Sequence, residues 1–349
     1  MTLFPTSVVG SLPRPAFVLD LIKGRPPLDR SEYRQRMEAA VQYAVAMQEH
    51  AGLDVITDGE WWRKSYIGVI AELAYGFELG TFHDGRPFTL AVDRLSPKTP
   101  GFIAREVLFL KTITKRQIKS TLPSPALLGE RMWTQEKSGR AFPKRQDFVR
   151  ACVPFLRREL ELIRNAGADI AQIDDPHLCL FVDPLVRSRY SDPDDAAAFA
   201  VEMINEVVNG ITGITIAVHL CRRAGARARG EHSHGGGYGP IIGHLNQLKA
   251  QHLTMEFTSP QAGDMAVFKE LRPDFEIGLG CVDVTPGHID EPETIANRVR
   301  QALKHLEPHR ITLNPDCGFA PGSGAAVSID EAYRKLCNEV AAARLLRQG

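Results

Sequence analysis

Short apolar runs alternate with longer amphipathic stretches along almost the whole chain. Several of the short runs are nearly all apolar and β-branched, as expected of parallel strands that helices cover on both faces. Strands are predicted over residues 6–9, 54–57, 117–121, 170–173, 214–219, 253–257, 276–282 and 310–314. Helices are predicted between them, over residues 31–51, 146–166, 193–210, 238–250, 262–271, 292–306 and 329–347. Eight strands that alternate with helices predict an α/β fold, a (β/α)8 TIM barrel.

The alternation breaks between the second and third predicted strands. Residues 61–116 contain an additional hairpin-like run, at residues 87–92 and 105–114. We interpret residues 61–116 as an insertion on the barrel rim, after the second strand, and residues 1–349 as one barrel. A doubly wound open sheet is the alternative fold. It is less favoured because no glycine-rich dinucleotide-binding turn follows the first strand.

The composition argues against whole classes of partner. Lys and Arg together number 42, as do Asp and Glu, so no overall charge favours nucleic acid or a membrane. No stretch approaches the roughly 18 to 20 apolar residues of a membrane span, and the N-terminus does not have the pattern of a secretory signal. The six cysteines are dispersed, which does not indicate a disulfide framework. We therefore expect a soluble cytoplasmic protein.

Polar side chains collect where the predicted strands end. In a barrel of this kind, the reactive residues lie at the carboxyl ends of the strands. The residues at those ends are Gly10 and Ser11, Asp58 to Glu60, Ser124, Asp174 and Asp175, His219 and Cys221, Glu256, Asp283, and Asp316 and Cys317. Strands that are apolar within and polar at one tip are what a packed barrel with a site at its mouth requires.

Two of these residues, His219 and Cys221, have the spacing of a metal-binding pair. Residues two apart in a strand point to the same side, so both side chains can aim at one point. Imidazole and thiolate together suit Zn²⁺ and disfavour Mg²⁺ or Ca²⁺. On the spacing alone, a buried histidine and cysteine without a metal are about as good an explanation. Cys317 ends the last strand, and a third metal-binding side chain favours zinc over a pair without a metal. Glu256 can supply a fourth ligand, from a strand that lies between those of Cys221 and Cys317 in the sequence.

Other polar residues have plainer explanations beside the functional ones. Pairing with arginine or helix capping at the barrel rim would account for Asp58, Glu60, Asp174 and Asp175. His232 and His234 form an H-x-H pair in a glycine-rich loop, where solvent exposure is favoured over metal binding. The basic residues of the same segment form a solvated helix face or supply anion contacts near the metal; they are Arg222, Arg223, Arg227 and Arg229.

A series of motifs resembles one enzyme family. They are VVGSLPRP (8–15), GLDVITDGE (52–60), LPSP (122–125), AQIDDP (171–176), HLCR (219–222), MEF (255–257), GLGCVD (278–283) and NPDCGF (314–319). They run in the family's order and cover nearly the whole chain, and QIDDP, HLC and NPDCG are specific when taken together. The chain resembles the cobalamin-independent methionine synthases, specifically their catalytic C-terminal barrel and its short, single-barrel relatives.

This resemblance implies a role for each matching position. It implies that Zn²⁺ is held by His219, Cys221, Glu256 and Cys317. The turn at Gly10 and Ser11 would meet the carboxylate of homocysteine, and its amino group would meet Glu60 and Asp174. The cofactor expected is therefore zinc, and the expected partners are a small thiol and an alkyl donor.

The proton-transfer residue follows less directly from the resemblance. The synthases have a histidine after the aspartate of the segment that GLGCVD matches, and that histidine is thought to assist proton transfer. Here the aspartate is Asp283, the residues after it are Val284, Thr285 and Pro286, and the nearest histidine is His288. Asp283 and His288 are thus the candidate catalytic residues.

The function that the resemblance implies is zinc-dependent S-methyl transfer to homocysteine or a similar thiol, of the 5-methyltetrahydropteroyltriglutamate–homocysteine type. Zinc would lower the pKa of the thiol, because the thiolate is the nucleophile. The sequence given does not include the additional N-terminal barrel that helps the long enzymes bind folate, so the methyl donor stays open. The segment 221–238 is closer to a short-chain branch that includes epoxyalkane:coenzyme M transferases. Thiol addition to an epoxide is therefore one alternative, and a metal-free barrel like porphyrinogen decarboxylase is another.

Overall fold

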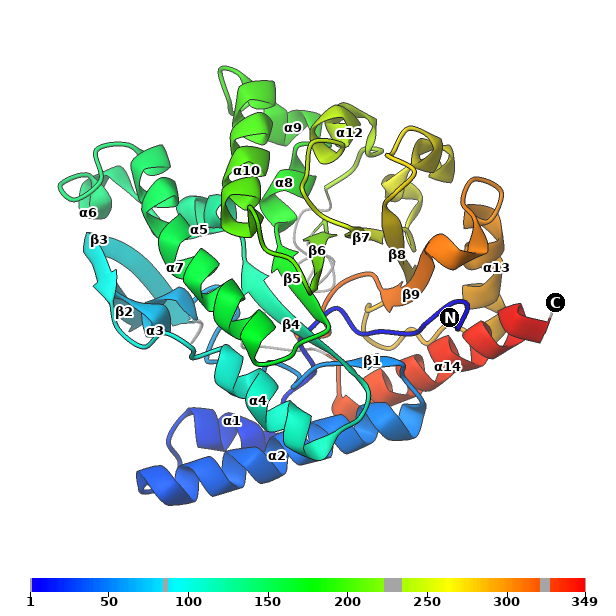
Figure 1. Cartoon of the computed structure of the whole chain (residues 1–349), viewed down its shortest axis with the longest axis horizontal. Helices are drawn as coiled ribbons and strands as arrows, with labels where there is room; N and C mark the ends of the chain where they lie inside the picture. Colours follow the sequence, from blue (N-terminus) through cyan, green and yellow to red (C-terminus); the bar gives the residue numbers. More distant parts are fainter. Residues whose placement is uncertain (1, 84–86, 223–233, 321–326, 349) are drawn as a thin grey trace.

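The computed structural model describes residues 2–83, 87–222, 234–320 and 327–348. Within these residues the main sheet has seven parallel strands, in the order β1-β4-β5-β6-β7-β8-β9. They are β1 (Val55–Ile56), β4 (Gln117–Pro123), β5 (Ile170–Asp174), β6 (Thr215–Leu220), β7 (His252–Glu256), β8 (Glu276–Val282) and β9 (Ile311–Pro315). Strands that follow one another along the chain are thus neighbours in the sheet, as in a barrel (Figure 1).

The N-terminal segment closes this sheet between its two edge strands. Thr6 bridges to Leu313 of β9, and Ser7 bridges to Val55 of β1, both in parallel. The Ser7 amide donates to the Leu313 carbonyl at 3.0 Å, and the Val55 amide donates to the Thr6 carbonyl at 3.0 Å. This segment takes the place of the first predicted strand, and the predicted barrel-type fold is confirmed.

Helices surround the strands, as Figure 1 shows. They are α1 (Ala16–Ile22), α2 (Arg30–Ala51), α7 (Arg145–Asn165), α10 (Pro193–Val208), α12 (Gly239–Leu245), α13 (Pro292–Ala302) and α14 (Ile329–Gln348). Their ends follow ordinary capping chemistry. The Asp29 side chain accepts from the amides of Ser31 and Glu32 at the start of α2, and the helix ends at Gly52, whose φ is 95°, a left-handed conformation that glycine adopts easily.

One predicted helix, at residues 262–271, is wrong. The chain forms two short 3-10 turns there, η1 (Pro260–Ala262) and η2 (Met265–Lys269). Gly263 separates them with a φ of 82°, and the Asp264 side chain caps the second turn by accepting from the Ala266 amide. A left-handed residue in the middle of the segment prevents a continuous helix.

The segment between β1 and β4 contains a two-stranded antiparallel hairpin, β2 (Ala74–Thr81) and β3 (Pro87–Pro97), which follows the short α3 (Ile70–Leu73). Residues 105–114, expected as part of the hairpin-like run, are helical instead and form most of α4 (Ala104–Ile113). The buried positions of α4 include Ala104, Val107 and Leu110, which have helical spacing. Three backbone amides at the start of α4 donate to the buried carboxylate of Glu159.

Shorter elements follow several strands at the end of the barrel where the site lies. They are α5 (Pro125–Met132), α6 (Gln135–Ser138), α8 (Pro176–Leu180) and α9 (Pro184–Arg187). At the opposite end of the barrel, η3 (Pro308–Arg310) directly precedes β9. Proline occupies the first turn of α5, α8 and α9, where its missing amide costs no hydrogen bond.

Polar side chains are buried along alternate positions of the strands. Lys119 on β4 donates to the Val8 carbonyl at 2.6 Å, and Gln172 on β5 donates to the Val9 carbonyl at 2.9 Å. The residues two further along these strands are Thr121 and Asp174, which belong to the candidate site. Because residues two apart in a strand point to the same side, polar side chains face the barrel interior from its middle to its mouth. No helix among the described residues is both long and apolar enough to cross a membrane.

Candidate metal and thiol-binding site

Three side chains of types that can bind a metal, from two distant strands, meet at the barrel mouth. His219 lies on β6, Cys221 directly follows β6, and Cys317 follows β9. Their ligand atoms all lie within 4.8 Å of one another, and all three residues are buried. The two Sγ atoms are 3.2 Å apart. The structure therefore brings together three of the four residues predicted as metal ligands.

The surroundings of His219 fit a bound metal ion. Its Nδ1 is 2.9 Å from Oδ1 of Asp174, whereas its Nε2 is buried and has no hydrogen-bond partner among the described residues. Burial alone would lower the pKa of His219, but Asp174 and Cys221 outweigh it and raise the pKa to about 10. The site thus favours positive charge, which a cation would supply in place of the proton. A carboxylate that orients the second nitrogen of a ligating histidine is a common arrangement, and an imidazole with two thiolates suits Zn²⁺.

Glu256, the fourth predicted ligand, lies at the end of β7 and is fully buried. Its carboxylate is not in the group of atoms within 4.8 Å. Oε2 accepts from the Arg222 amide at 3.0 Å, and the Glu256 amide donates to the hydroxyl of Tyr238 at 2.9 Å. The ligand role of Glu256 stays a prediction.

Asp316 fastens the end of β9 to the end of β7. Its Oδ1 accepts from the amides of Phe257 and Thr258 at 3.1 and 3.2 Å, and the Thr258 hydroxyl donates to Oδ2. The intervening strand β8 carries Gly280 at this level, where a Cβ atom would lie 2.8 Å from Oδ1 of Asp316. A glycine at this position lets the Asp316 side chain reach across β8, so the positions of Cys317 and of the β7 tip depend on each other.

The four residues predicted to bind the substrate lie around the same mouth. Oε1 of Glu60 accepts from the Thr121 hydroxyl at 2.7 Å, and a Cβ atom at Gly10 would lie 2.8 Å from that oxygen. Ser11 Oγ accepts from the Ala320 amide at 3.2 Å, which places the Gly10–Ser11 turn against the segment that carries the last predicted ligand. The role of these residues towards a ligand stays a prediction.

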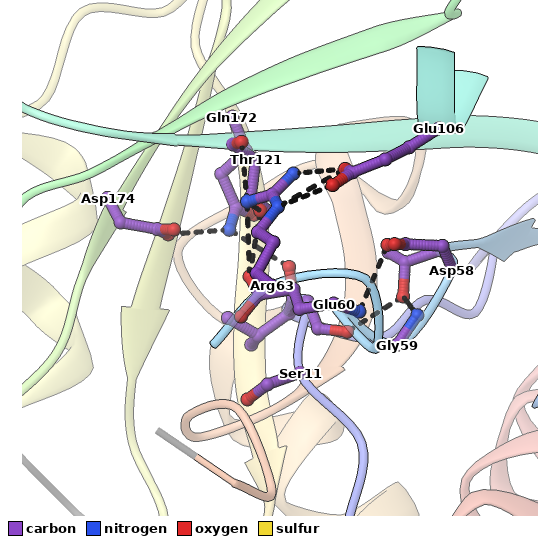
Figure 2. Close-up of polar contacts among 12 residues, drawn as sticks. Ser11, Asp58, Gly59, Glu60, Arg63, Glu106, Thr121, Gln172 and Asp174 are labelled. Atoms are coloured by element: carbon purple, nitrogen blue, oxygen red, sulfur yellow. Dashed lines mark hydrogen bonds and ion pairs between the residues drawn. The ribbon is translucent and has the colours of Figure 1, made fainter. Parts of the chain in front are cut away.

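Apart from Asp58, the sequence did not reveal the charged residues around Glu60. Arg63 Nη2 is 2.6 Å from Oε2 of Glu106, and both side chains are buried. Asp58 Oδ1 accepts from the Glu60 amide at 3.0 Å, and Arg14 donates to the carbonyls of Glu60 and Arg63. Figure 2 shows several of these residues around the Arg63 guanidinium. No local sequence signal links Arg63 to Glu106, because they are 43 residues apart.

Tyr66 is another residue that sequence reasoning missed. Burial raises the pKa of Tyr66, Arg131 opposes that shift, and Asp174, Cys221 and Cys317 add to it. The phenol therefore lies within electrostatic range of the thiol cluster. No motif marked Tyr66, since it follows the matched segment at residues 52–60.

The two candidate catalytic residues lie in the loop after β8. Asp283 Oδ1 accepts from the Thr285 amide at 2.7 Å, and His288, with 58% of its side chain exposed, is 3.1 Å from Asp290. Asp290 also pairs with Arg298 of α13. The Asp283 carbonyl also accepts from Lys335 of α14 at 2.8 Å. A catalytic role for either residue remains a prediction.

Part of the basic, glycine-rich segment lies outside the described residues, including His232, Arg223, Arg227 and Arg229. His234 is described, and the expectation of solvent exposure is wrong for it. Its side chain is buried, and Nδ1 is 2.8 Å from Oδ2 of Asp183. Pairing with a carboxylate offsets the cost of burying the imidazole.

Comparisons with known proteins agree over nearly the whole chain. A family model described as the catalytic domain of cobalamin-independent synthases matches residues 4–345. The methionine synthase of Pyrococcus horikoshii is 26% identical over 358 aligned positions, which cover 100% of this chain and 94% of that protein. A methionine synthase of Saccharolobus islandicus is also 26% identical, with 100% and 96% covered.

Solved structures show the same fold. A B12-independent methionine synthase from Shewanella, in complex with selenomethionine, superposes with a TM-score of 0.81 at 21% identity, covering 99% of this chain and 98% of that one. A methyltransferase from Methanosarcina mazei superposes with a TM-score of 0.60 at 14% identity, covering 99% and 95%.

Proposed function

The chain belongs to the cobalamin-independent synthase family, matched through its catalytic domain, and on that premise we propose that it transfers a methyl group to the thiol of homocysteine with the help of Zn²⁺. Membership confirms the resemblance drawn from the motifs and supports a methyltransferase of the methionine synthase type. The observation that carries the proposal is the buried cluster of His219, Cys221 and Cys317, in which one imidazole nitrogen has no hydrogen-bond partner among the described residues.

Zinc at this cluster would lower the pKa of the substrate thiol and so supply a thiolate nucleophile at neutral pH. Two carboxylates of the chain hold the predicted zinc ligands in position. Asp174 orients the His219 imidazole through Nδ1, and Asp316 fixes the end of β9 next to Cys317. In the reaction, a bond forms between the substrate sulfur and the methyl carbon, the bond from that carbon to the donor breaks, and its electron pair leaves with the donor.

The amino-acid end of the substrate has matching groups nearby. Both Gln172 and His219 bind Asp174 through Oδ1, so Oδ2 accepts no hydrogen bond among the described residues and is suited to an ammonium group. Glu60 supports a second contact to the same ammonium. The turn at Gly10 and Ser11 is suited to the substrate carboxylate, because it lies beside the segment that carries Cys317.

The two alternatives find less support. A sulfonate, as in coenzyme M, needs a cationic contact. Of the basic residues predicted to supply anion contacts, Arg222 is the one whose structure is described. Its guanidinium donates to the carbonyls of Gly236 and Ala262 and lies 4.3 Å from the centre of the Tyr238 ring. That guanidinium is therefore already engaged. A metal-free barrel of the porphyrinogen decarboxylase type does not account for the clustered thiols.

The test combines metal analysis with product analysis. Zinc-loaded protein is incubated with L-homocysteine and, in separate reactions, with a methylfolate or with methylcobalamin, and the products are read by mass spectrometry. We expect methionine from at least one donor, and loss of the product when the metal is removed by chelation. Full activity of protein that metal analysis shows to be free of zinc would contradict the proposal.

A further inference from the structure

A buried ion pair that the proposed reaction does not use lies close to the substrate-binding turn. Arg63 and Glu106 are 2% and 4% exposed. Their side chains meet through two nitrogens of the guanidinium, at 2.6 Å from Nη2 to Oε2 and 3.0 Å from Nε to Oε1. Burial alone would lower the pKa of Arg63, but the Glu106 carboxylate raises it. We take the pair as ionic, because an arginine keeps its proton in a protein and an uncharged Glu106 would leave that cation buried without its partner.

Thr121 connects this ion pair to Glu60. Arg63 Nη1 donates to the carbonyl of Thr121 at 3.0 Å and to its hydroxyl oxygen at 2.9 Å. A guanidinium can only donate hydrogen bonds, so the Thr121 hydroxyl accepts from Arg63 and turns its own proton to Glu60 Oε1, which is 2.7 Å away. The direction of each hydrogen bond from Arg63 to Glu60 is therefore fixed (Figure 2).

The same geometry leaves the Glu60 side chain without a hydrogen bond from a cation among the described residues. Arg63 Nη1 is 4.0 Å from Oε1 of Glu60, and its charge is met by Glu106. Arg14 donates to the main-chain carbonyls of Glu60 and Arg63, at 2.8 and 2.9 Å, and not to their side chains. Asp58 Oδ2 is buried and has no hydrogen-bond partner among the described residues. The cluster thus carries negative charge that a bound cation can balance.

The backbone of Glu60 also needs support. Its φ is 59°, a left-handed conformation that residues other than glycine adopt only when their surroundings hold them there. The Glu60 amide donates to Asp58, and the Glu60 carbonyl accepts from Arg14. Main chain and side chain of Glu60 are therefore held by separate partners, and the side chain depends on Thr121.

We propose that Arg63 is a positioning residue for Glu60 and sets the preference of the site for a thiol that carries an ammonium group. Because Glu106 meets the charge of Arg63, Arg63 can orient the Thr121 hydroxyl without neutralising Glu60. The Glu60 carboxylate is then both fixed in place and available to a substrate cation. This inference rests on the proposed function, whose amino-acid substrate supplies the ammonium group.

The experiment compares two ligands that differ only in the ammonium group, so it does not depend on the methyl donor. Binding of L-methionine and of 4-(methylthio)butanoate to the zinc-loaded full chain is measured by calorimetry. The wild-type protein is expected to prefer L-methionine. In Glu106→Gln, the released charge of Arg63 acts on Glu60, and the preference for L-methionine is expected to fall about tenfold, while affinity for 4-(methylthio)butanoate does not fall.

Glu159→Gln is the control for a disturbance of α4, the helix that carries Glu106, since Glu159 is another buried glutamate and accepts from backbone amides at and just before the start of that helix. It is expected to lower the melting temperature and to keep the wild-type preference. Thr121→Val is the second variant, which decides the matter if circular dichroism shows that Glu106→Gln does not fold. It keeps the side-chain volume but removes the hydroxyl, and is expected to lower the preference as well.

Two outcomes overturn the inference, and they are distinguishable. A wild-type protein with no preference for L-methionine removes the amino-acid substrate of the proposed function and the inference with it. A wild-type preference that folded Glu106→Gln and Thr121→Val both retain overturns the positioning role of Arg63 alone.

Discussion

At the scale of single residues, the barrel mouth combines features that a sequence reveals with features that it hides. His219 could be predicted because it ends an apolar strand and has a cysteine two residues later, and Cys317 because it ends the last strand. Arg63 and Glu106 could not, since each looks like an ordinary surface residue until the fold buries them together. An ion pair between residues this far apart in the sequence leaves no periodic pattern from which it could be predicted.

Replacing Cys317 with serine is expected to abolish zinc retention and activity, because a hydroxyl is a much poorer zinc ligand than a thiolate at neutral pH. Zinc content after dialysis, measured by atomic absorption, is the readout. Cys337→Ser is the control, since Cys337 is a free thiol on α14 outside the cluster. A Cys317→Ser protein that keeps one zinc per chain would show that the cluster is not the metal site.

Gly10→Ala is expected to weaken homocysteine binding at least about tenfold without loss of zinc, since an added methyl group cannot be accommodated without movement. The new Cβ atom would lie 2.8 Å from Oε1 of Glu60 and 2.9 Å from Cγ2 of Thr121. Calorimetric titration with homocysteine and metal analysis of the same sample check both halves of the prediction. Unchanged homocysteine affinity would place the substrate away from this turn.

At the scale of elements, the strands were easier to predict than the connections between them. Each strand is marked by its own apolar run, but a connection depends on single residues such as Gly263, whose left-handed backbone divides the helix expected at 262–271. The sequence of α4 predicts part of a hairpin, because its apolar residues occur in a β-rich stretch. Its N-terminus is fixed by Glu159, which lies more than 50 residues further along the chain.

The tips of β7 and β9 are expected to move apart in Gly280→Ala. The added Cβ atom would lie 2.6 Å from the Met255 carbonyl and 2.8 Å from Oδ1 of Asp316, so the contact that spans β8 would be disturbed. We expect zinc affinity to fall roughly 10- to 100-fold, as for other losses of support around metal ligands. Competition with a chromogenic chelator measures the affinity.

Gly243→Ala is the matched control for this substitution. Gly243 lies in α12, and a Cβ atom there would meet nothing within 4 Å. The substitution is therefore expected to leave zinc affinity unchanged and, by helix propensity, not to lower stability. Equal zinc affinity in the two variants would mean that the Asp316 contact does not support the metal site.

At the scale of the whole molecule, the barrel buries a polar layer beneath its mouth. Burial lowers the pKa of Lys119 to about 7, although Asp174 and Glu339 oppose the shift. In the unfolded chain this lysine has its ordinary pKa, about 10.4. Between these two values the unfolded state binds a proton that the folded state does not, so the free energy of unfolding rises with pH in this range.

Lys119→Met is expected to remove this rise. Relative to the variant, the wild-type protein should gain up to about 1.4 kcal/mol of unfolding free energy for each pH unit between pH 7 and pH 10. Urea unfolding of both proteins at several pH values in this window measures the difference. Parallel pH profiles would show that the lysine keeps its proton in the folded barrel.

The strand that closes the barrel has a consequence for the order of events during synthesis. Its Ser7 amide donates to Glu339 of α14, 332 positions later, and its neighbours in the sheet are β1 and the last strand. This segment can pair with β1 early, but its contacts with β9 and α14 can form only after the chain between them has been synthesised. Contacts this far apart in sequence make folding slow. The adjoining turn at Gly10 and Ser11 is completed with this closure, so a nascent chain is expected to gain its ligand-binding ability only after α14 has been synthesised.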